Sequence, residues 1–195
     1  AGHTQLLAEW NPEVQGEQTL VIKQSPVLKD HATLRYHKIK VAFVKEDATI
    51  GEVKDVIILD KDRTEVKFTN ADYKAIILNY QDWGFVKVEL DNASRDFFLK
   101  KLVKVHESEA VAKLLVIRSL TDMVRDAKIK GTEYAESMLG YIEFTTSNSL
   151  MFEAVADNIN QALTVWSPGK ATGEISDKVF DKLVEIKKIV RTAGY

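Results

Sequence analysis

Apolar and polar side chains alternate in several short runs within the first 91 residues. In the run "HKIKVAFV", Ile39, Val41 and Phe43 fall on one side of an extended chain, while Lys38 and Lys40 fall on the other. Such alternation is typical of a strand with one buried and one solvent-exposed face, as antiparallel sheets allow. We therefore predict strands over six β-branched runs, at residues 19–24, 37–44, 52–59, 64–68, 74–78 and 84–90.

Polar turn segments such as "EDATIG" and "DKDRT" separate these runs. Six short strands at this spacing predict an antiparallel β-sandwich of immunoglobulin-like size. Strand propensity alone does not choose between a sandwich and a barrel, so the pattern leaves both open.

After residue 91 the apolar positions recur with the period of a helix. Ser94 is the expected N-cap of a helix in which Phe98, Leu102 and Val105 share one face. A longer helix is expected over residues 107–127, and its apolar positions are Val111, Leu114, Leu115, Ile117, Leu120 and Val124.

Gly131 interrupts the helical pattern, and two further helices are predicted over residues 132–142 and 149–166. Pro168 and Gly169 are expected to end the second of these. Ser176 is the expected cap of the last helix, whose apolar positions are Val179, Phe180, Leu183, Val184, Ile186 and Val190. A run of strands followed by a run of helices indicates an α+β chain with two segregated modules.

Composition narrows the class of protein but not its activity. The 195 residues are 45% hydrophobic and 29% charged, which is ordinary for a globular protein. The net charge of −2 gives no reason to expect nucleic acid or an anionic membrane as a partner. No signal peptide or membrane-length apolar run is present, and the absence of cysteine excludes disulfides and thiolate metal sites. We expect a cytoplasmic protein.

The segment "KVHESEAVAK" resembles the opening of the zinc motif H-E-x-x-H at His106 and Glu107. The second histidine would stand four residues on, so that both rings reach one ion from one helix face, and that position holds Ala110. The distal glutamate of the motif would fall on Ile129, and neither side chain can bind zinc. The other histidines, His3, His31 and His37, have no such spacing with His106. We expect a helix start here, with Glu107 and Glu109 in its first turn, and no zinc.

Two other segments could carry chemistry. "DMVRD" contains Asp122, Arg125 and Asp126, which can pair across one helical turn while Met123 and Val124 are buried, so we favour a surface ion pair over a catalytic cluster. The basic segment "KLVEIKKIVR" is amphipathic, and we favour an ordinary packed helix over a membrane-binding one. No nucleophile elbow, phosphate-binding loop or dinucleotide motif occurs.

Several motifs together resemble the C-terminal part of the aminopeptidase N-type zinc aminopeptidases, the gluzincin family. "AGHTQL" is similar to the linker that follows the catalytic domain, and "IKQSP" and "LRYHKIKVAFV" are similar to the family's Q-x-x-P and L-R-P-H-R-I-x-I-G-L-Y strands. "LNYQDWGFVKVELD" resembles L-x-N-x-x-D-x-x-Y-x-K-V-x-L-D, and "SLTDMVRDAKI" resembles the helix with W-D-M-x-R-D. Tyr36, Lys38 and Thr121 depart from the pattern, replacing a proline, an arginine and a tryptophan. The matches follow the family's order over residues 1–129.

The resemblance implies a linker at residues 1–15, a β-sandwich domain at 16–92 and a truncated, superhelix-like α-helical domain at 93–195. It also implies a parent enzyme that removes N-terminal residues from peptides with zinc held in a catalytic domain absent from this chain. The fragment itself would be inactive, hold no zinc or other cofactor, and help to shape and close the peptide-binding cleft. The motif positions, expected to be structural, are Leu34, Arg35, His37, Asn79, Asp82, Lys87, Asp91, Asp122, Met123, Arg125 and Asp126.

Two other hypotheses stay open. The chain could be a protein-binding or scaffold module from a catalytically inactive relative, or a free-standing sandwich with a helical interaction domain. Peptide substrates would be reached only through the parent, and contacts with the missing catalytic domain would be the main partner interaction. A truncated helical half would expose apolar faces and favour self-association.

Overall fold

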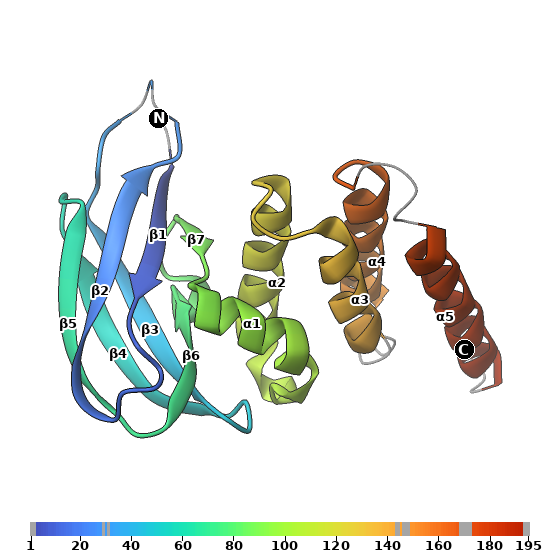
Figure 1. The fold of residues 1–195 in the computed structure, drawn as a ribbon, viewed down its shortest axis with the longest axis horizontal. Helices are drawn as coiled ribbons and strands as arrows, with labels where there is room; N and C mark the ends of the chain where they lie inside the picture. The colour runs from blue at the N-terminus through green and yellow to red at the C-terminus, as the bar shows by residue number, and fades with distance from the viewer. Residues whose placement is uncertain are drawn as a thin grey trace. The chain divides into compact units, whose positions relative to one another are not determined.

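The computed structural model describes residues 3–28, 30, 32–142, 145, 149–167 and 173–192, apart from the side chains of residues 107, 149–150 and 187–192. Over these residues seven strands precede five α-helices (Figure 1). The predicted α+β class, with a sheet module followed by a helical module, is therefore confirmed. Contacts within the chain divide it into two compact units, residues 1–120 and 121–195.

The first unit contains two sheets. The strands are β1 (Thr4–Glu9), β2 (Gly16–Pro26), β3 (His37–Lys45), β4 (Ile50–Ile58), β5 (Arg63–Asn70), β6 (Tyr73–Leu78) and β7 (Lys87–Glu89). One sheet has the order β5-β2-β1-β7, in which only the β1–β7 pair is parallel, and the other has the antiparallel order β4-β3-β6. The two sheets lie on different sides of the module in Figure 1.

Apolar side chains from both sheets meet in one core. Phe43 of β3 stacks on Phe68 of β5, with 4.6 Å between the ring centroids, although these strands belong to different sheets. Leu20 and Ile22 of β2 and Ile39 of β3 are fully buried. Burial of such side chains stabilises a fold by roughly 1.5–3 kcal/mol each, so this shared core is the main support of the first unit.

All six predicted strands are present, with boundaries that differ by up to three residues. The predicted linker, however, contains a seventh strand, because β1 pairs with both β2 and β7. Leu6 and Ala8 of β1 are buried, yet the run is too short and too poor in β-branched residues to stand out in the sequence. The strand predicted at residues 84–90 is shorter than expected, since only Lys87–Glu89 pairs with β1.

The alternation predicted for β3 is correct for its first half only. Ile39, Val41 and Phe43 are buried as expected, but Ala42 and Val44 on the opposite face are buried as well. β3 is the central strand of its sheet, and helix α1 (Asn92–Lys101) packs against the neighbouring strand β6. A strand that is covered on both faces does not alternate.

The first unit continues through two 3₁₀ turns, η3 (Leu102–Lys104) and η4 (Glu107–Glu109), into helix α2 (Ala110–Arg125). The prediction of one continuous helix over residues 107–127 is wrong at both ends, because the 3₁₀ turn precedes α2 and Ala127 has a left-handed φ of 57°. Val111 and Leu114, expected on the apolar face, are about half exposed and form an outer stripe with Arg118. Leu115, Leu120 and Val124 are buried as expected.

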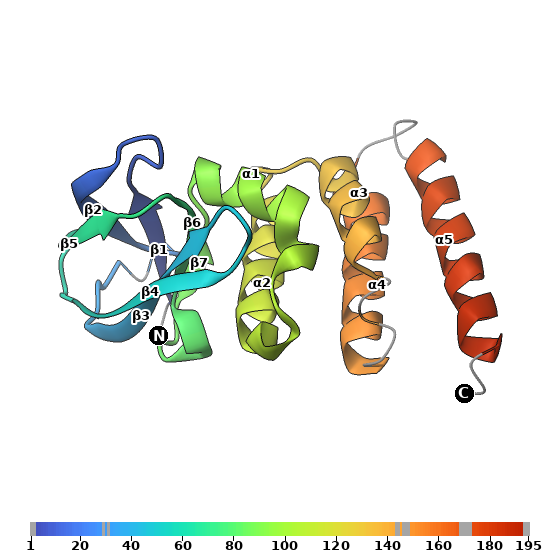
Figure 2. The ribbon, with the colours of Figure 1, turned by 90° about the horizontal axis from the view of Figure 1, so that it is seen from below.

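The second unit contains α3 (Gly131–Ile142), α4 (Ser149–Thr164) and α5 (Gly173–Thr192). Helices α3 and α4 lie side by side in both views (Figures 1 and 2). Gly131 begins α3 and does not merely interrupt the pattern. Ser176 lies inside α5 and is not its cap, and Phe180 is largely exposed. The predicted stop at Pro168 and Gly169 and the side chain of Val190 lie outside the described residues.

None of the helices in the described part of the chain is both long and apolar enough to cross a membrane.

Candidate functional site

The loop of residues 79–84 follows β6 and contains two of the predicted motif residues. We call it the Asn79 loop. Asn79, Gln81 and Asp82 have left-handed φ angles of 59°, 66° and 57°. This region is uncommon for residues other than glycine and is best tolerated by Asn and Asp. Three such residues within four positions require contacts that hold the backbone in place.

The side chain of Asn79 supplies many of these contacts from a fully buried position. Its amide nitrogen donates to the Gly84 carbonyl oxygen at 2.8 Å and to Asp82 Oδ1 at 3.1 Å, and its Oδ1 accepts from the Gly84 N–H at 2.7 Å. An amide side chain can donate two hydrogen bonds and accept at the same time, and asparagine tolerates left-handed φ, which explains asparagine here. A Cβ at Gly84 would lie 2.9 Å from Ile39 Cγ2, so glycine closes the loop against β3.

Two contacts join the Asn79 loop to the helical segment of the same unit. The Tyr80 hydroxyl donates to Glu109 Oε2 in η4 at 2.8 Å. Arg118 Nη2 in α2 lies 3.0 Å from Asp82 Oδ1. Burial, together with the hydrogen bond to Glu109, raises the pKa of Tyr80 to about 12, so the hydroxyl stays a proton donor. The loop therefore connects the sheets to α2.

His106, the residue that suggested zinc, caps the turn η4. Its Nδ1 accepts from the Ser108 backbone N–H at 3.2 Å, and the Ser108 hydroxyl lies 2.8 Å from the same nitrogen. This fits the predicted role at a helical start, although the turn is 3₁₀ and the side chain of Glu107 lies outside the described residues. Within the described part of the chain, no three His, Asp or Glu side chains are grouped closely enough to hold one metal ion.

Asp91, and not Ser94 as the sequence suggested, is the N-cap of α1. Asp91 Oδ1 accepts from the Ser94 N–H at 3.1 Å, and Oδ2 accepts from the Ser94 hydroxyl at 2.5 Å. Ser94 Oγ in turn accepts from the Ile76 N–H of β6 at 2.8 Å. Ser94 is fully buried, so its hydroxyl ties α1 to the sheet while the aspartate begins the helix.

We expect Asp91→Ala to lower the free energy of unfolding by about 1–2 kcal/mol through loss of the cap. Burial raises the pKa of Asp91 above its ordinary value of 3.8, and the hydrogen bonds from Ser94 oppose this shift. Because the folded chain then binds this proton more tightly than the unfolded chain, the contribution of Asp91 to stability falls as pH rises above the ordinary carboxyl pKa.

Asp91→Asn keeps a capping side chain without the titration. The stability of the native chain relative to this variant should therefore decrease between about pH 3 and about pH 7, as measured by urea unfolding. A difference that does not change over this range would contradict the shifted pKa.

The motif residues near β3 hold backbone segments together. The Arg35 N–H donates to Oε1 of the buried Gln24 at 2.9 Å, and Gln24 Nε2 donates to the carbonyl oxygen of Leu59 at 2.8 Å. His37 Nε2 lies 2.7 Å from Thr4 Oγ1, which links β3 to β1. Burial, with the charge of Arg35, lowers the pKa of His37. Leu34 is half-buried in the connection before β3.

The motif residues at the end of α2 belong to the second unit. Met123 is buried, and Arg125 Nη1 lies 3.5 Å from Asp122 Oδ1, so the predicted ion pair is confirmed. Asp126 donates its backbone N–H to the Asp122 carbonyl oxygen. Thr121, which departs from the family pattern, has its hydroxyl 2.9 Å from the hydroxyl of the buried Tyr134 in α3.

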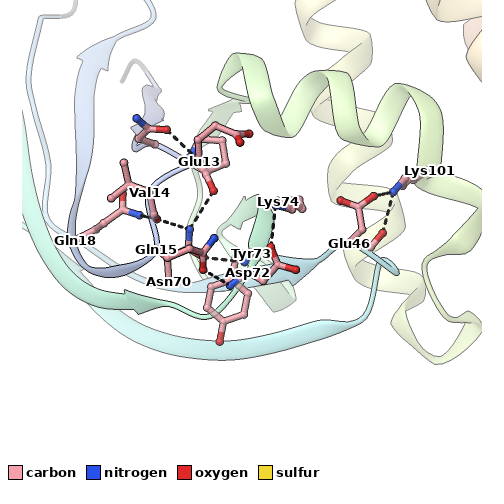
Figure 3. A network of polar contacts seen from close by, with 12 residues as sticks. Glu13, Val14, Gln15, Gln18, Glu46, Asn70, Asp72, Tyr73, Lys74 and Lys101 are labelled. Atoms are coloured by element: carbon pink, nitrogen blue, oxygen red, sulfur yellow. Dashed lines mark hydrogen bonds and ion pairs between the residues drawn. The ribbon is translucent and has the colours of Figure 1, made fainter.

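A second polar network was not anticipated from the sequence. The buried Asn70 donates to the carbonyl oxygens of Pro12 and Val14 and accepts from the Tyr73 N–H at 2.7 Å (Figure 3). It joins the β1–β2 connection to the β5–β6 turn. Glu46 and Lys101 form a nearby ion pair between the β3–β4 turn and the end of α1 (Figure 3). Single asparagines between apolar runs give no sequence signal for such a role.

The structure thus brings Asn79 and Asp82 together in one loop and Asp122, Arg125 and Asp126 together at the end of α2, and it leaves the other motif residues in separate places. Lys87, for example, is half-buried in β7, where its partner in the parallel register is Gln5. Most of these residues hydrogen-bond to backbone groups or interact with another motif residue. No family model matches this chain, and no curated protein matches it.

Proposed function

We propose that this chain is a non-catalytic C-terminal region of an aminopeptidase N-type zinc aminopeptidase, and that it helps to shape and close the cleft of its parent. The parent would remove N-terminal residues from peptides. Its zinc would act as a Lewis acid and activate the attacking water. Within this proposal the two sheets form an immunoglobulin-like sandwich, α2–α5 are the first part of a superhelical domain, and the location is cytoplasmic.

The Asn79 loop is the observation that supports this proposal. Asn79 and Asp82 are two of the polar positions shared with the family motif, and they hydrogen-bond to each other in a loop of unusual backbone geometry. Asp82 also pairs with Arg118 at the point where the strands give way to helices. A motif that shapes the junction between the sheet module and the helical module suits a region that positions domains and carries out no chemistry.

A scaffold module from an inactive relative is the alternative. Exposed Val111 and Leu114 on α2 and exposed Phe180 on α5 favour it, because such side chains are available for contacts with another protein. The same side chains could contact the parent's catalytic domain or a second copy of the chain. The coding sequence that adjoins this segment distinguishes the hypothesis of an enzyme from that of a scaffold.

We expect the purified chain to bind less than about 0.1 zinc per molecule and to release no arylamine from aminoacyl-arylamide substrates, since catalytic zinc takes three protein ligands. His106→Ala is the matched variant and should change neither result. One zinc per chain that is lost in His106→Ala would overturn the proposal. An adjoining coding sequence with an intact H-E-x-x-H and distal glutamate supports the enzyme, and one with degraded ligands supports the scaffold.

A further inference from the structure

An exposed aromatic surface lies beside the Asn79 loop, in the first unit. Trp83 and Phe85 are 55% and 80% exposed, and Tyr36 and Ile57 are 66% and 64% exposed. We call this group, with Lys38 and Lys40, the Trp83 surface. Isolated exposed apolar residues are normal, but several large ones together mark an interaction site.

Contacts link four of these residues, Lys38, Lys40, Trp83 and Ile57, into one surface. Tyr36 and Phe85 lie two residues along the chain from Lys38 and Trp83. The ammonium groups of Lys38 and Lys40 lie 5.5 Å and 4.9 Å from the centroid of the Trp83 ring. Lys38 is the partner of Ile57 in the β3–β4 register, so both side chains extend from the same face of this sheet. The ring of Phe85 lies 4.4 Å from that of His3, next to β1.

The backbone of the Asn79 loop keeps Trp83 at the surface. Trp83 directly follows Asp82, the last of the three residues with left-handed φ. It precedes Gly84, whose N–H donates a hydrogen bond to Asn79 Oδ1. Each such conformation costs of order 1 kcal/mol or more and is retained where surrounding contacts fix it. A strained loop that exposes tryptophan, the residue most enriched among interface hot spots, points to recognition.

The charges on the Trp83 surface indicate which kind of binding partner it fits. Lys38 lies opposite Ile57 and Lys40 lies opposite Asp55 in the β3–β4 register, but neither lysine is ion-paired with a carboxylate in the part of the chain that the structure describes. Asp82 is paired with Arg118, and Asp60 interacts with the Tyr36 hydroxyl. Two ammonium groups beside an exposed indole suit a segment that carries carboxylates and an apolar side chain. Two lysines in a chain of net charge −2 are too few to follow a phosphate backbone.

We propose that the Trp83 surface binds an acidic peptide segment, whose carboxylates pair with Lys38 and Lys40 and whose apolar side chain packs on Trp83 and Phe85. This inference goes beyond the proposed function and does not depend on it, because all residues of the surface lie in the first unit and none is needed for zinc chemistry.

The test is fluorescence anisotropy with a labelled twelve-residue peptide of alternating glutamate and phenylalanine or leucine. We expect saturable binding below about 1 mM, with at least a tenfold loss of affinity in K38E/K40E. Trp83→Ala should weaken binding by a factor of at least ten. The control K67E/K100E makes the same charge change at two exposed lysines outside the surface and should bind like the native chain.

The glutamine version of the peptide should bind at least tenfold more weakly to the native chain, and twelve-residue oligothymidylate should not compete. K38E/K40E leaves the Asn79 loop intact, so its affinity tests the proposal even if Trp83→Ala disturbs the fold. Equal loss in K38E/K40E and K67E/K100E, no binding at 1 mM, or tighter binding of oligothymidylate than of the acidic peptide would each overturn the proposal.

Discussion

Asn79→Ala is expected to lower the free energy of unfolding of the first unit by about 3 kcal/mol. The substitution removes three hydrogen bonds, leaves the Gly84 N–H and carbonyl without their side-chain partner, and places alanine at a φ of 59°. Urea unfolding measures the change, and hydrogen exchange of peptides from β3 and β6 assigns it to this unit.

Asn79→Gly separates the two causes of this loss. Glycine adopts left-handed φ freely but makes none of the three hydrogen bonds, so it should recover about 1 kcal/mol relative to alanine. If Asn79→Ala destabilises by less than about 1 kcal/mol, the loop does not depend on this side chain, and the structural role assigned to the motif is wrong.

The second large effect is expected in the helical unit, at Gly131. A Cβ at this position would lie well inside van der Waals contact of the Ala162 backbone carbonyl, near the C-terminal end of α4, and of the Ser167 hydroxyl, just after that helix. Backbone cannot move aside as a flexible side chain can, so α3 and α4 would have to separate. We expect Gly131→Ala to cost about 3 kcal/mol.

Gly140→Ala is the matched control in the same helix. A Cβ there meets nothing within 4 Å, and the position is exposed, so alanine should stabilise the unit by about 0.5–1 kcal/mol. Thermal unfolding followed by circular dichroism compares the variants. Similar melting temperatures for Gly131→Ala and the native chain would contradict the close approach of the two helices.

The change of apolar period near residue 91 was enough to predict the class and the order of the modules. The sequence could not show which elements of the fold would pack against or pair with each other. The strand β1 is stabilised by pairing with β2 and β7, which no local pattern reports. The burial of Ala42 and Val44 depends in the same way on neighbouring elements and not on β3 itself.

The candidate site was predictable only in part. Asn79 and Asp82 could be singled out from the motif, but their left-handed backbone and the link to Arg118 follow from tertiary contacts. Ser94 has the chemistry of a cap, and Asp91 takes that role because the sheet uses the Ser94 hydroxyl. Nothing in the sequence indicated that Trp83 is exposed, because exposure is a property of the folded chain.

The proposed function makes this chain the non-catalytic part of a zinc aminopeptidase. Native mass spectrometry of the protein captured from its own cells, with an antibody against this chain, tests that claim most directly. We expect one polypeptide that is larger than 195 residues by a catalytic domain and carries one zinc ion. A polypeptide of 195 residues without zinc, or a larger one whose added sequence has no gluzincin motif, would contradict it.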